Sequence, residues 1–142
     1  MPIKMQCEEI LPWFGLQAEF DLWEQRPDNP VTIIRTGEPW GVVVRWTTRG
    51  ELNNIMCGRW VIQGFLEKYG PQEAPALAPV YVAIVSAPNN YSVTLTFPPQ
   101  EEGAYRLAIT IRMLGPRNVP APIACSGETS LLQFYPGGPI QP

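Results

Sequence analysis

The sequence predicts an all-β fold, a single antiparallel β-sandwich of about seven strands that follows an N-terminal arm. Several stretches alternate apolar and polar side chains with the period of two that a half-buried strand requires. The 17 prolines and 12 glycines mark frequent turns between short elements. A chain of 142 residues with 45% hydrophobic residues can also bury one core without further support. We therefore expect one compact domain.

Three segments carry the strongest strand signals. The segment 40–47 places four large apolar side chains on one face, Trp40, Val42, Val44 and Trp46. The segment 59–70 repeats the alternation, and its interruption by Gly64 indicates a bulge or a close neighbour. The segment 104–114 alternates most cleanly, with Tyr105, Leu107, Ile109, Ile111 and Met113 on one side. We expect these three segments to be core strands.

Shorter β-rich segments supply four further strands, at 31–36, 80–86, 91–97 and 130–135. The second and third of these are joined through Asn89 and Asn90, and asparagine accepts the positive φ angles of tight turns, so we expect a hairpin. Proline donates no backbone hydrogen bond and is excluded from central strands. Proline-rich segments are therefore expected to be linkers or tail, at 71–79, 114–122 and 136–142.

The charge divides unevenly along the chain. Residues 1–30 hold six acids and two bases, a net charge of −4, whereas residues 31–142 have a net charge of +1. We interpret 1–30 as an acidic arm with a possible extra strand at 16–25, 31–135 as the sandwich, and 136–142 as a Pro/Gly-rich tail. The run at 16–25 is expected to pack on a sheet, either its own or that of a neighbouring subunit.

The order of these segments resembles a known family. The stretch VVVRW ends in Trp46, the stretch WVIQGFLEKYG alternates aromatic and hydrophobic residues, and TLTFPPQEEGAYRL runs through a turn to Tyr105. This pattern, over residues 31–135, resembles an immunoglobulin-like sandwich, specifically a fibronectin type III-like one. The resemblance implies that Tyr105 forms a tyrosine corner by bonding to backbone near the preceding turn. It implies no antibody-like disulfide, because Leu107 occupies the place of the second cysteine.

Composition excludes several classes of function. Charged residues make up 16% of the chain and the net charge is −3, which is unsuited to neutralising phosphates, so we expect no nucleic-acid partner. The sequence contains no run of eighteen apolar residues, so we expect no membrane span. Its start lacks the apolar core of a signal peptide. The three cysteines are odd in number and far apart, at Cys7, Cys57 and Cys125. We therefore expect reduced thiols and a cytoplasmic protein.

The chain lacks the side chains that most catalytic sites need. It has no histidine, which excludes serine and cysteine triads and the common zinc motifs. The adjacent acids at 8–9 and 101–102 lie on opposite strand faces or in a turn, so they do not form a glycosidase pair. No phosphate-binding, dinucleotide or calcium motif is present. We expect no enzyme activity, no cofactor and no metal.

Two kinds of binding remain. The first is a non-catalytic structural or protein-protein interaction module that assembles with itself, as an oligomer or filament subunit, or binds another protein. Its apolar candidate contacts are Trp13, Phe20, Leu22, Trp23 and Trp40. Its polar candidates are the outward arginines Arg45, Arg59, Arg106 and Arg112, which the arm acids Glu19, Asp21 and Glu24 could meet.

The alternative is a sandwich that binds a small ligand or a carbohydrate. Exposed aromatic rings can stack on sugars, and the candidates for such a platform are Trp13, Trp23 and Trp40. The polar partners would be the loop asparagines Asn53, Asn54, Asn89 and Asn90. The same asparagines also suit ordinary turns.

Overall fold

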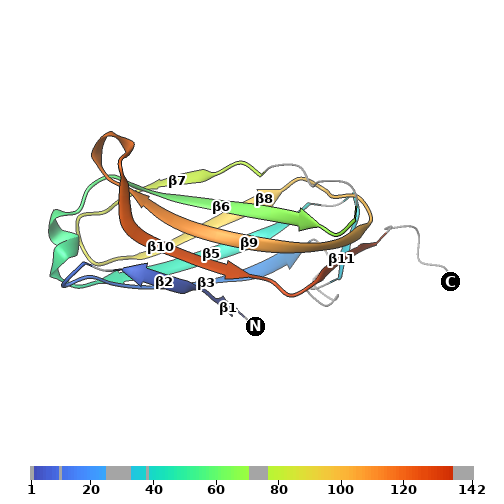
Figure 1. The fold of residues 1–142 in the computed structure, drawn as a ribbon, viewed down its shortest axis with the longest axis horizontal. Helices are drawn as coiled ribbons and strands as arrows, with labels where there is room; N and C mark the ends of the chain where they lie inside the picture. The colour runs from blue at the N-terminus through green and yellow to red at the C-terminus, as the bar shows by residue number, and fades with distance from the viewer. Residues whose placement is uncertain (1, 10, 25–32, 38, 71–76, 136–142) are drawn as a thin grey trace.

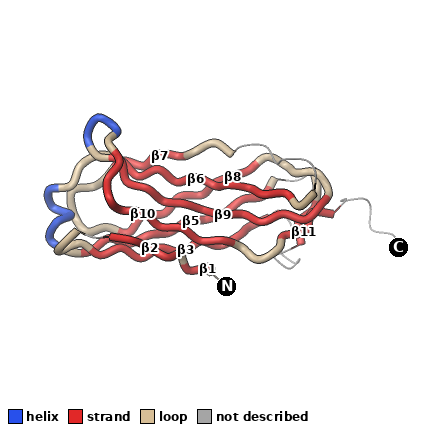
Figure 2. Tube along the Cα trace, in the orientation of Figure 1, coloured by secondary structure: helices blue, strands red, loops and turns tan. Residues whose placement is uncertain are grey.

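The protein folds as a two-layer β-sandwich (Figure 1) in a computed structural model that describes residues 2–9, 11–24, 33–37, 39–70 and 77–135. The strands are β1 (Ile3–Lys4), β2 (Gln6–Glu9), β3 (Gly15–Glu24), β4 (Ile33–Arg35), β5 (Trp40–Arg49), β6 (Arg59–Lys68), β7 (Val80–Ala83), β8 (Asn90–Phe97), β9 (Gly103–Leu114), β10 (Pro120–Glu128) and β11 (Leu132–Tyr135). Two 3-10 turns, η1 (Glu51–Ile55) and η2 (Pro116–Asn118), lie at the same end (Figure 2). The all-β class is confirmed, with eleven described strands rather than seven.

The first sheet has the strand order β1-β3-β5-β8 and is antiparallel throughout. Strand β5 lies between β3 and β8, and its alternate residues point into the sandwich, where Val42 and Val44 are fully buried. The residues that alternate with these point outward and include Val43 and Arg45. The strand expected at 40–47 is therefore a core strand of this sheet.

The second sheet is organised around β9. One edge of β9 pairs with β6 over ten residues, and β6 in turn pairs with β7. The other edge of β9 is shared by β10 and β11, which are flanked by β2 and β4 respectively. All of these pairs are antiparallel except β4 with β11. The clean alternation of the β9 sequence thus corresponds to the central strand of this sheet.

Aromatic rings fill the space between the sheets. The Trp46 indole stacks on Tyr91 with ring centroids 5.1 Å apart, and Trp60 meets both rings edge on. A second cluster joins Trp40 to Phe97 and Phe134 at about the same spacing, 5.0 and 5.1 Å. These pairs add to the burial of the aromatic surface, so they fix how one sheet sits on the other.

The hairpin expected between 80–86 and 91–97 is wrong. Strand β7 pairs with β6 in the second sheet, whereas β8 pairs with β5 in the first. The connecting residues therefore cross from one sheet to the other. The Thr48 amide donates to the Asn89 carbonyl oxygen at 3.0 Å, so Asn89 helps to dock this crossing against β5 rather than forming a two-residue turn.

Two segments that are not among the seven expected strands belong to the sandwich. Strand β3, within the proposed arm, pairs with β5 of the same chain over ten residues. Strand β10 begins inside 114–122, which was expected to be a linker. Its two early prolines fall where the register with β9 shifts between Pro120 and Ala124, so they interrupt no regular pairing. The proposed tail at 136–142 lies outside the described residues.

Two local expectations are confirmed. The Tyr105 hydroxyl donates a hydrogen bond to the Glu101 carbonyl oxygen at 2.9 Å, which fixes the turn before β9. Gly64 has close neighbours, because a Cβ added there would lie 3.0 Å from the ring of Phe97 and 3.1 Å from Leu77. Glycine at 64 therefore lets Phe97 and Leu77 pack closely against the strand, and a larger residue would have to displace them.

A disulfide joins the two ends of the sandwich sequence. Cys7 on β2 and Cys125 on β10 face each other in the register and are bonded across 118 residues of sequence. The expectation of three reduced thiols is therefore wrong for these two, and Cys57 is free and exposed. The separation of the cysteines along the chain did not indicate this bond, because only the pairing of β2 with β10 brings them together.

Candidate binding surfaces

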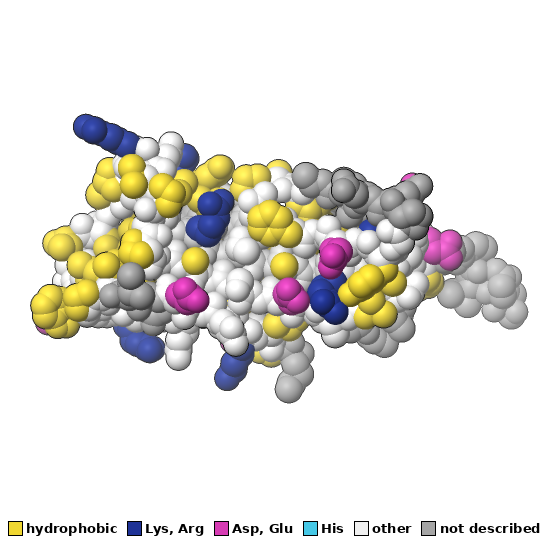
Figure 3. Space-filling view, viewed as in Figure 1, with side chains coloured by type: hydrophobic (Ala, Val, Ile, Leu, Met, Phe, Trp, Pro, Cys, Tyr) yellow, Lys and Arg dark blue, Asp and Glu magenta, His cyan; other side chains and the backbone are white. Residues whose placement is uncertain are grey.

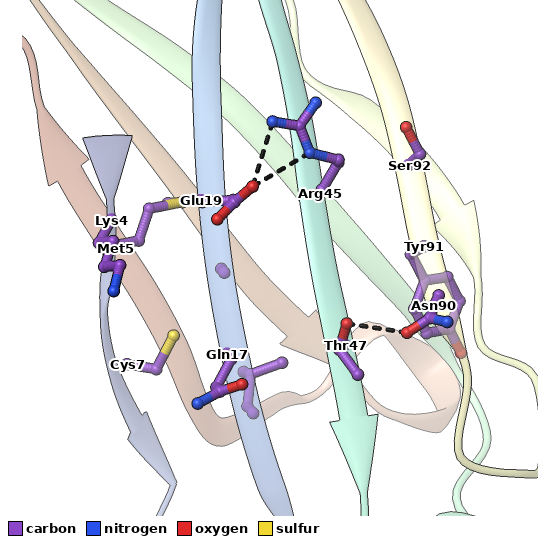
Figure 4. Close-up of a pocket in the computed structure, with 12 residues that line it drawn as sticks. Lys4, Met5, Cys7, Gln17, Glu19, Arg45, Thr47, Asn90, Tyr91 and Ser92 are labelled. Atoms are coloured by element: carbon purple, nitrogen blue, oxygen red, sulfur yellow. Dashed lines mark hydrogen bonds and ion pairs between the residues drawn. The ribbon is translucent and has the colours of Figure 1, made fainter. Parts of the chain in front are cut away.

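The outer face of the first sheet carries a groove of about 630 Å³. It is lined by residues of β3, β5 and β8, by Lys4 of β1 and the adjoining Met5, and by Cys7 of β2 (Figure 4). The polar side chains are Gln17, Glu19, Arg45, Thr47, Asn90 and Ser92. They lie together because every second residue of β3, β5 and β8 points out of the sandwich.

An ion pair network crosses the groove. The Arg45 guanidinium donates from Nε and Nη2 to Glu19 Oε2 at 3.2 and 3.1 Å, and from Nη2 to the Asp21 carboxylate. The expected meeting of arm acids with an outward arginine is confirmed here, within one chain. The hydrogen bond to Asp21, and then that to Glu19, raises the pKa of Arg45. The arginine therefore remains charged, and its Nε and Nη2 already donate to two carboxylates.

The rest of the groove offers neutral hydrogen-bonding groups. The Thr47 hydroxyl donates to Asn90 Oδ1 at 2.9 Å, and the amide of Asn90 keeps free donors. Gln17 and Ser92 are exposed beside this pair. Among the described residues, no group of three or more acidic, cysteine or histidine side chains is placed to hold a metal ion. The groove is thus suited to hydrogen bonding with a polar ligand.

Trp23 lies farther along the same face. A Cβ added at Gly41 would approach the Trp23 indole nitrogen to 2.9 Å, so the ring packs against the bare glycine backbone. Its Nε1 is buried and has no hydrogen-bond partner, while the side chain as a whole is half-buried. Trp23 is therefore only partly available as a stacking platform.

A second surface lies at one end of the sandwich, where four loops present exposed apolar side chains. These side chains are Trp13, Ile55, Val85 and Val119, which are 73%, 77%, 46% and 59% exposed. We call this group the apolar loop end. Figure 3 shows hydrophobic side chains gathered at this end, which carries η1 and η2 in Figure 2.

Backbone contacts hold these loops against one another. The Leu52 amide donates to the Trp13 carbonyl oxygen at 3.1 Å, which ties the β2–β3 loop to η1. The Ser86 hydroxyl donates to the Met56 carbonyl oxygen at 3.0 Å, which ties the β7–β8 crossing to the same region. A Cβ at Gly58 would lie 2.1 Å from the Leu114 carbonyl oxygen, so the β9–β10 loop approaches there as well.

The backbone of Trp13 has an unusual conformation. Its φ angle is +59°, a left-handed value that costs a residue other than glycine roughly 1–2 kcal/mol. Gly50 lies against it, since a Cβ there would be 2.1 Å from the Trp13 carbonyl oxygen. The chain therefore holds a large apolar side chain in solvent at a position where glycine would be less strained.

The predicted apolar contacts are divided between core and surface. Phe20 and Trp40 are fully buried, and the Trp40 indole nitrogen donates to the Pro98 carbonyl oxygen at 3.0 Å, so neither forms an exposed contact. Leu22 and Trp23 are half-buried on β3. Trp13 alone of this set is largely exposed.

The other arginines lie on the outer face of the second sheet, apart from Arg45 on the first. Arg59 donates to Asn118 Oδ1 at 2.7 Å and lies 4.3 Å from the centre of the Tyr81 ring. Arg106 is exposed, and its Nη1 lies 3.9 Å from Glu128 Oε1. Arg112 is exposed six residues farther along β9. The structure therefore does not bring the four arginines together.

Among the proposed loop asparagines, only Asn90 lines the groove. Asn53 is buried and its Nδ2 donates to the Gly50 carbonyl oxygen at 3.0 Å, which is turn chemistry. Asn54 is exposed in η1, and Asn89 docks the sheet crossing described above. Sequence reasoning missed Ile55, Val85 and Val119. Ile55 and Val85 carry no distinguishing signal, because each stands next to another apolar residue, Met56 or Ile84, that is less exposed.

Comparison with known proteins returned no matching family model, no matching curated protein and no matching solved structure. In the described part of the chain, the helices are too short and too polar to cross a membrane.

Proposed function

We propose that this chain is a non-catalytic protein-interaction module that binds a protein partner through the apolar loop end. The observation that carries the proposal is the convergence of Trp13, Ile55, Val85 and Val119 at one end of the sandwich. Contiguous exposed apolar surface is costly in water and marks interaction sites in folded proteins. Aromatic and aliphatic anchors of this kind also dominate binding energy at protein interfaces.

The fold supports an immunoglobulin-like scaffold of the fibronectin type III-like kind. Strands β3, β5 and β8 in one sheet lie opposite β7, β6, β9 and β10 in the other, a packing of two sheets that is compatible with such a sandwich. The hydrogen bond from Tyr105 to Glu101 matches the tyrosine corner of such sandwiches. In this architecture the loops between strands gather at the ends, and loops on a rigid scaffold commonly carry binding. The apolar loop end is one such loop cluster.

The test compares variants in partner capture from extracts of the source cells. Trp13→Ser and Ile55→Ser remove the two most exposed anchors, and Phe65→Ser is the matched control, because Phe65 is 50% exposed on β6, outside the apolar loop end. The proposal predicts a protein that is retained by wild type and by Phe65→Ser and lost with both loop variants. Equal retention by all four proteins would contradict it.

Self-assembly through the arm is not part of this proposal. The edge of β3 that faces β5 is paired over all ten residues, and Phe20 within β3 is buried. A strand of a second chain could pair with β3 only at its other edge, where β1 already pairs with Phe20 and Glu19.

A second candidate function is binding of a polar small ligand or a carbohydrate in the groove. The specific observation in its favour is the row of Gln17, Thr47, Asn90 and Ser92 beside the network of Arg45. Titration of simple sugars and oligosaccharides by calorimetry, with Asn90→Ala as the variant, tests this function. Heat that is lost in Asn90→Ala would favour it, and no heat with any sugar would count against it.

The disulfide supports an oxidising compartment rather than the cytoplasm expected from the sequence. Disulfides persist in such compartments and are rare where thiols are kept reduced. Alkylation of the protein taken directly from cells, under denaturing and non-reducing conditions, should label Cys57 alone. Labelling of all three cysteines would place the protein in a reducing compartment.

A further inference from the structure

The segment that carries β7 and β8 is uncharged. Residues 74–100 contain no Asp, Glu, Lys or Arg, although such residues make up 16% of the chain. Strands β7 and β8 lie within this segment. They form one edge of each sheet, β7 next to β6 and β8 next to β5, on the same side of the sandwich (Figure 1).

The outer edge of β8 lacks the usual protection of edge strands. Edges are normally shielded by charged side chains, prolines, bulges or very short length. Strand β8 has eight residues, contains none of those residue types, and pairs with β5 without a register shift. Within the described residues, β5 is the one strand that pairs with it. Its outer backbone groups can therefore accept another strand.

The seam between the two edges is apolar and only partly covered. Val80, Val82 and Ile84 from the β7 side, and Val93 from β8, are half-buried against the core. A strand added beside β8 would remove part of this apolar surface from water.

We propose that β8 pairs antiparallel with β8 of a second copy of this chain, so that two four-stranded sheets become one of eight strands. A two-fold axis places the residue at its centre beside its own copy, where like charges would repel. A charge-free edge is therefore suited to pairing with itself. This surface differs from the apolar loop end, so its test stands independently of the function proposed above.

Side-chain alternation restricts the register of the pairing. Inward residues of one β8 must lie opposite inward residues of the other. This requires that the residue at the two-fold axis lies directly opposite its own copy. An axis at Thr94 places Thr94 opposite its copy and Ser92 opposite Thr96 on the outer face. On the inner face, Val93 meets Leu95. Hydroxyl pairs of this kind are favourable across antiparallel strands.

The first experiment measures mass by sedimentation equilibrium over roughly 1–300 μM, the range suited to a small, weak interface. Wild type should shift from monomer to dimer. Thr94→Lys and Thr94→Glu should each be monomeric, and their equimolar mixture should dimerise again. Ser126→Lys, an exposed position on β10, is the control and should behave as wild type. A monomeric wild type, or a dimer that survives Thr94→Lys, would overturn the proposal.

The second experiment tests the register by oxidative cross-linking in a Cys57→Ser background. Paired residues on antiparallel strands have Cα atoms about 4.5–5.5 Å apart, which a disulfide spans, so Thr94→Cys should cross-link. Ser92 would lie about 13 Å from its copy, so Ser92→Cys should not. Cross-linking at 92 but not at 94 would overturn the Thr94 axis.

Discussion

Removal of the Cys7–Cys125 disulfide should lower the free energy of unfolding by about 2–5 kcal/mol. The bond closes a loop with a sequence separation of 118, for which the chain-entropy relation gives about 5 kcal/mol at 25 °C as the upper value. Small domains have only about 5–15 kcal/mol in total, so the loss is a large fraction. Removal of the bond also leaves β2 without a covalent link to the second sheet.

Urea unfolding of wild type with and without a reductant measures this loss, with the midpoint expected to fall by roughly 1–3 M. Reduction keeps both sulfur atoms in place, so it separates the bond from side-chain packing. Cys57→Ala is the control, because Cys57 is exposed and free and should change stability by less than about 0.5 kcal/mol. A loss below about 1 kcal/mol on full reduction would refute the reasoning.

Three further predictions concern the core, the turn before β9 and the groove. Trp46→Ala should cost about 3–5 kcal/mol in urea unfolding, because Trp46 is 1% exposed and stacked on Tyr91, and a loss below about 1 kcal/mol would place it outside the core. Tyr105→Phe should cost about 1 kcal/mol through the bond to Glu101, and an unchanged midpoint would count against that bond. Arg45→Met should cost less than about 1 kcal/mol, and this difference should shrink at high salt. Since the pKa of Arg45 is raised, its contribution is present below the ordinary arginine pKa as long as the carboxylates of Glu19 and Asp21 are ionised, and it is lost as the pH rises through the raised value.

Alternation predicted the strands whose two faces differ most. In β5 and β9 the inward residues are large and apolar, so the faces can be told apart from the residues alone. The Tyr105 bond could also be expected, because it spans four residues and depends on one turn. Strand β10 was missed because its outward residues include Ala124, which barely contrasts with inward Ile123 and Cys125, and because prolines begin it.

The features that depend on pairing of distant strands could not be read from local patterns. The disulfide requires β2 to lie beside β10. The hairpin expected between 80–86 and 91–97 does not form, because β7 and β8 join different sheets. The apolar loop end is a similar case. Ile55, Val85 and Val119 are far apart in sequence and come together only when their loops reach the same end of the sandwich.

The most direct test of the interaction function places a photoreactive group on Cys57, which is exposed at the apolar loop end beside η1. Photolysis in extracts of the source cells should join the chain to one protein partner, and Ile55→Ser should abolish that product. The control carries the same group on Glu102→Cys in a Cys57→Ser background, at the opposite end of the sandwich between β8 and β9. Products that are the same from both positions, or no product from Cys57, would contradict the account.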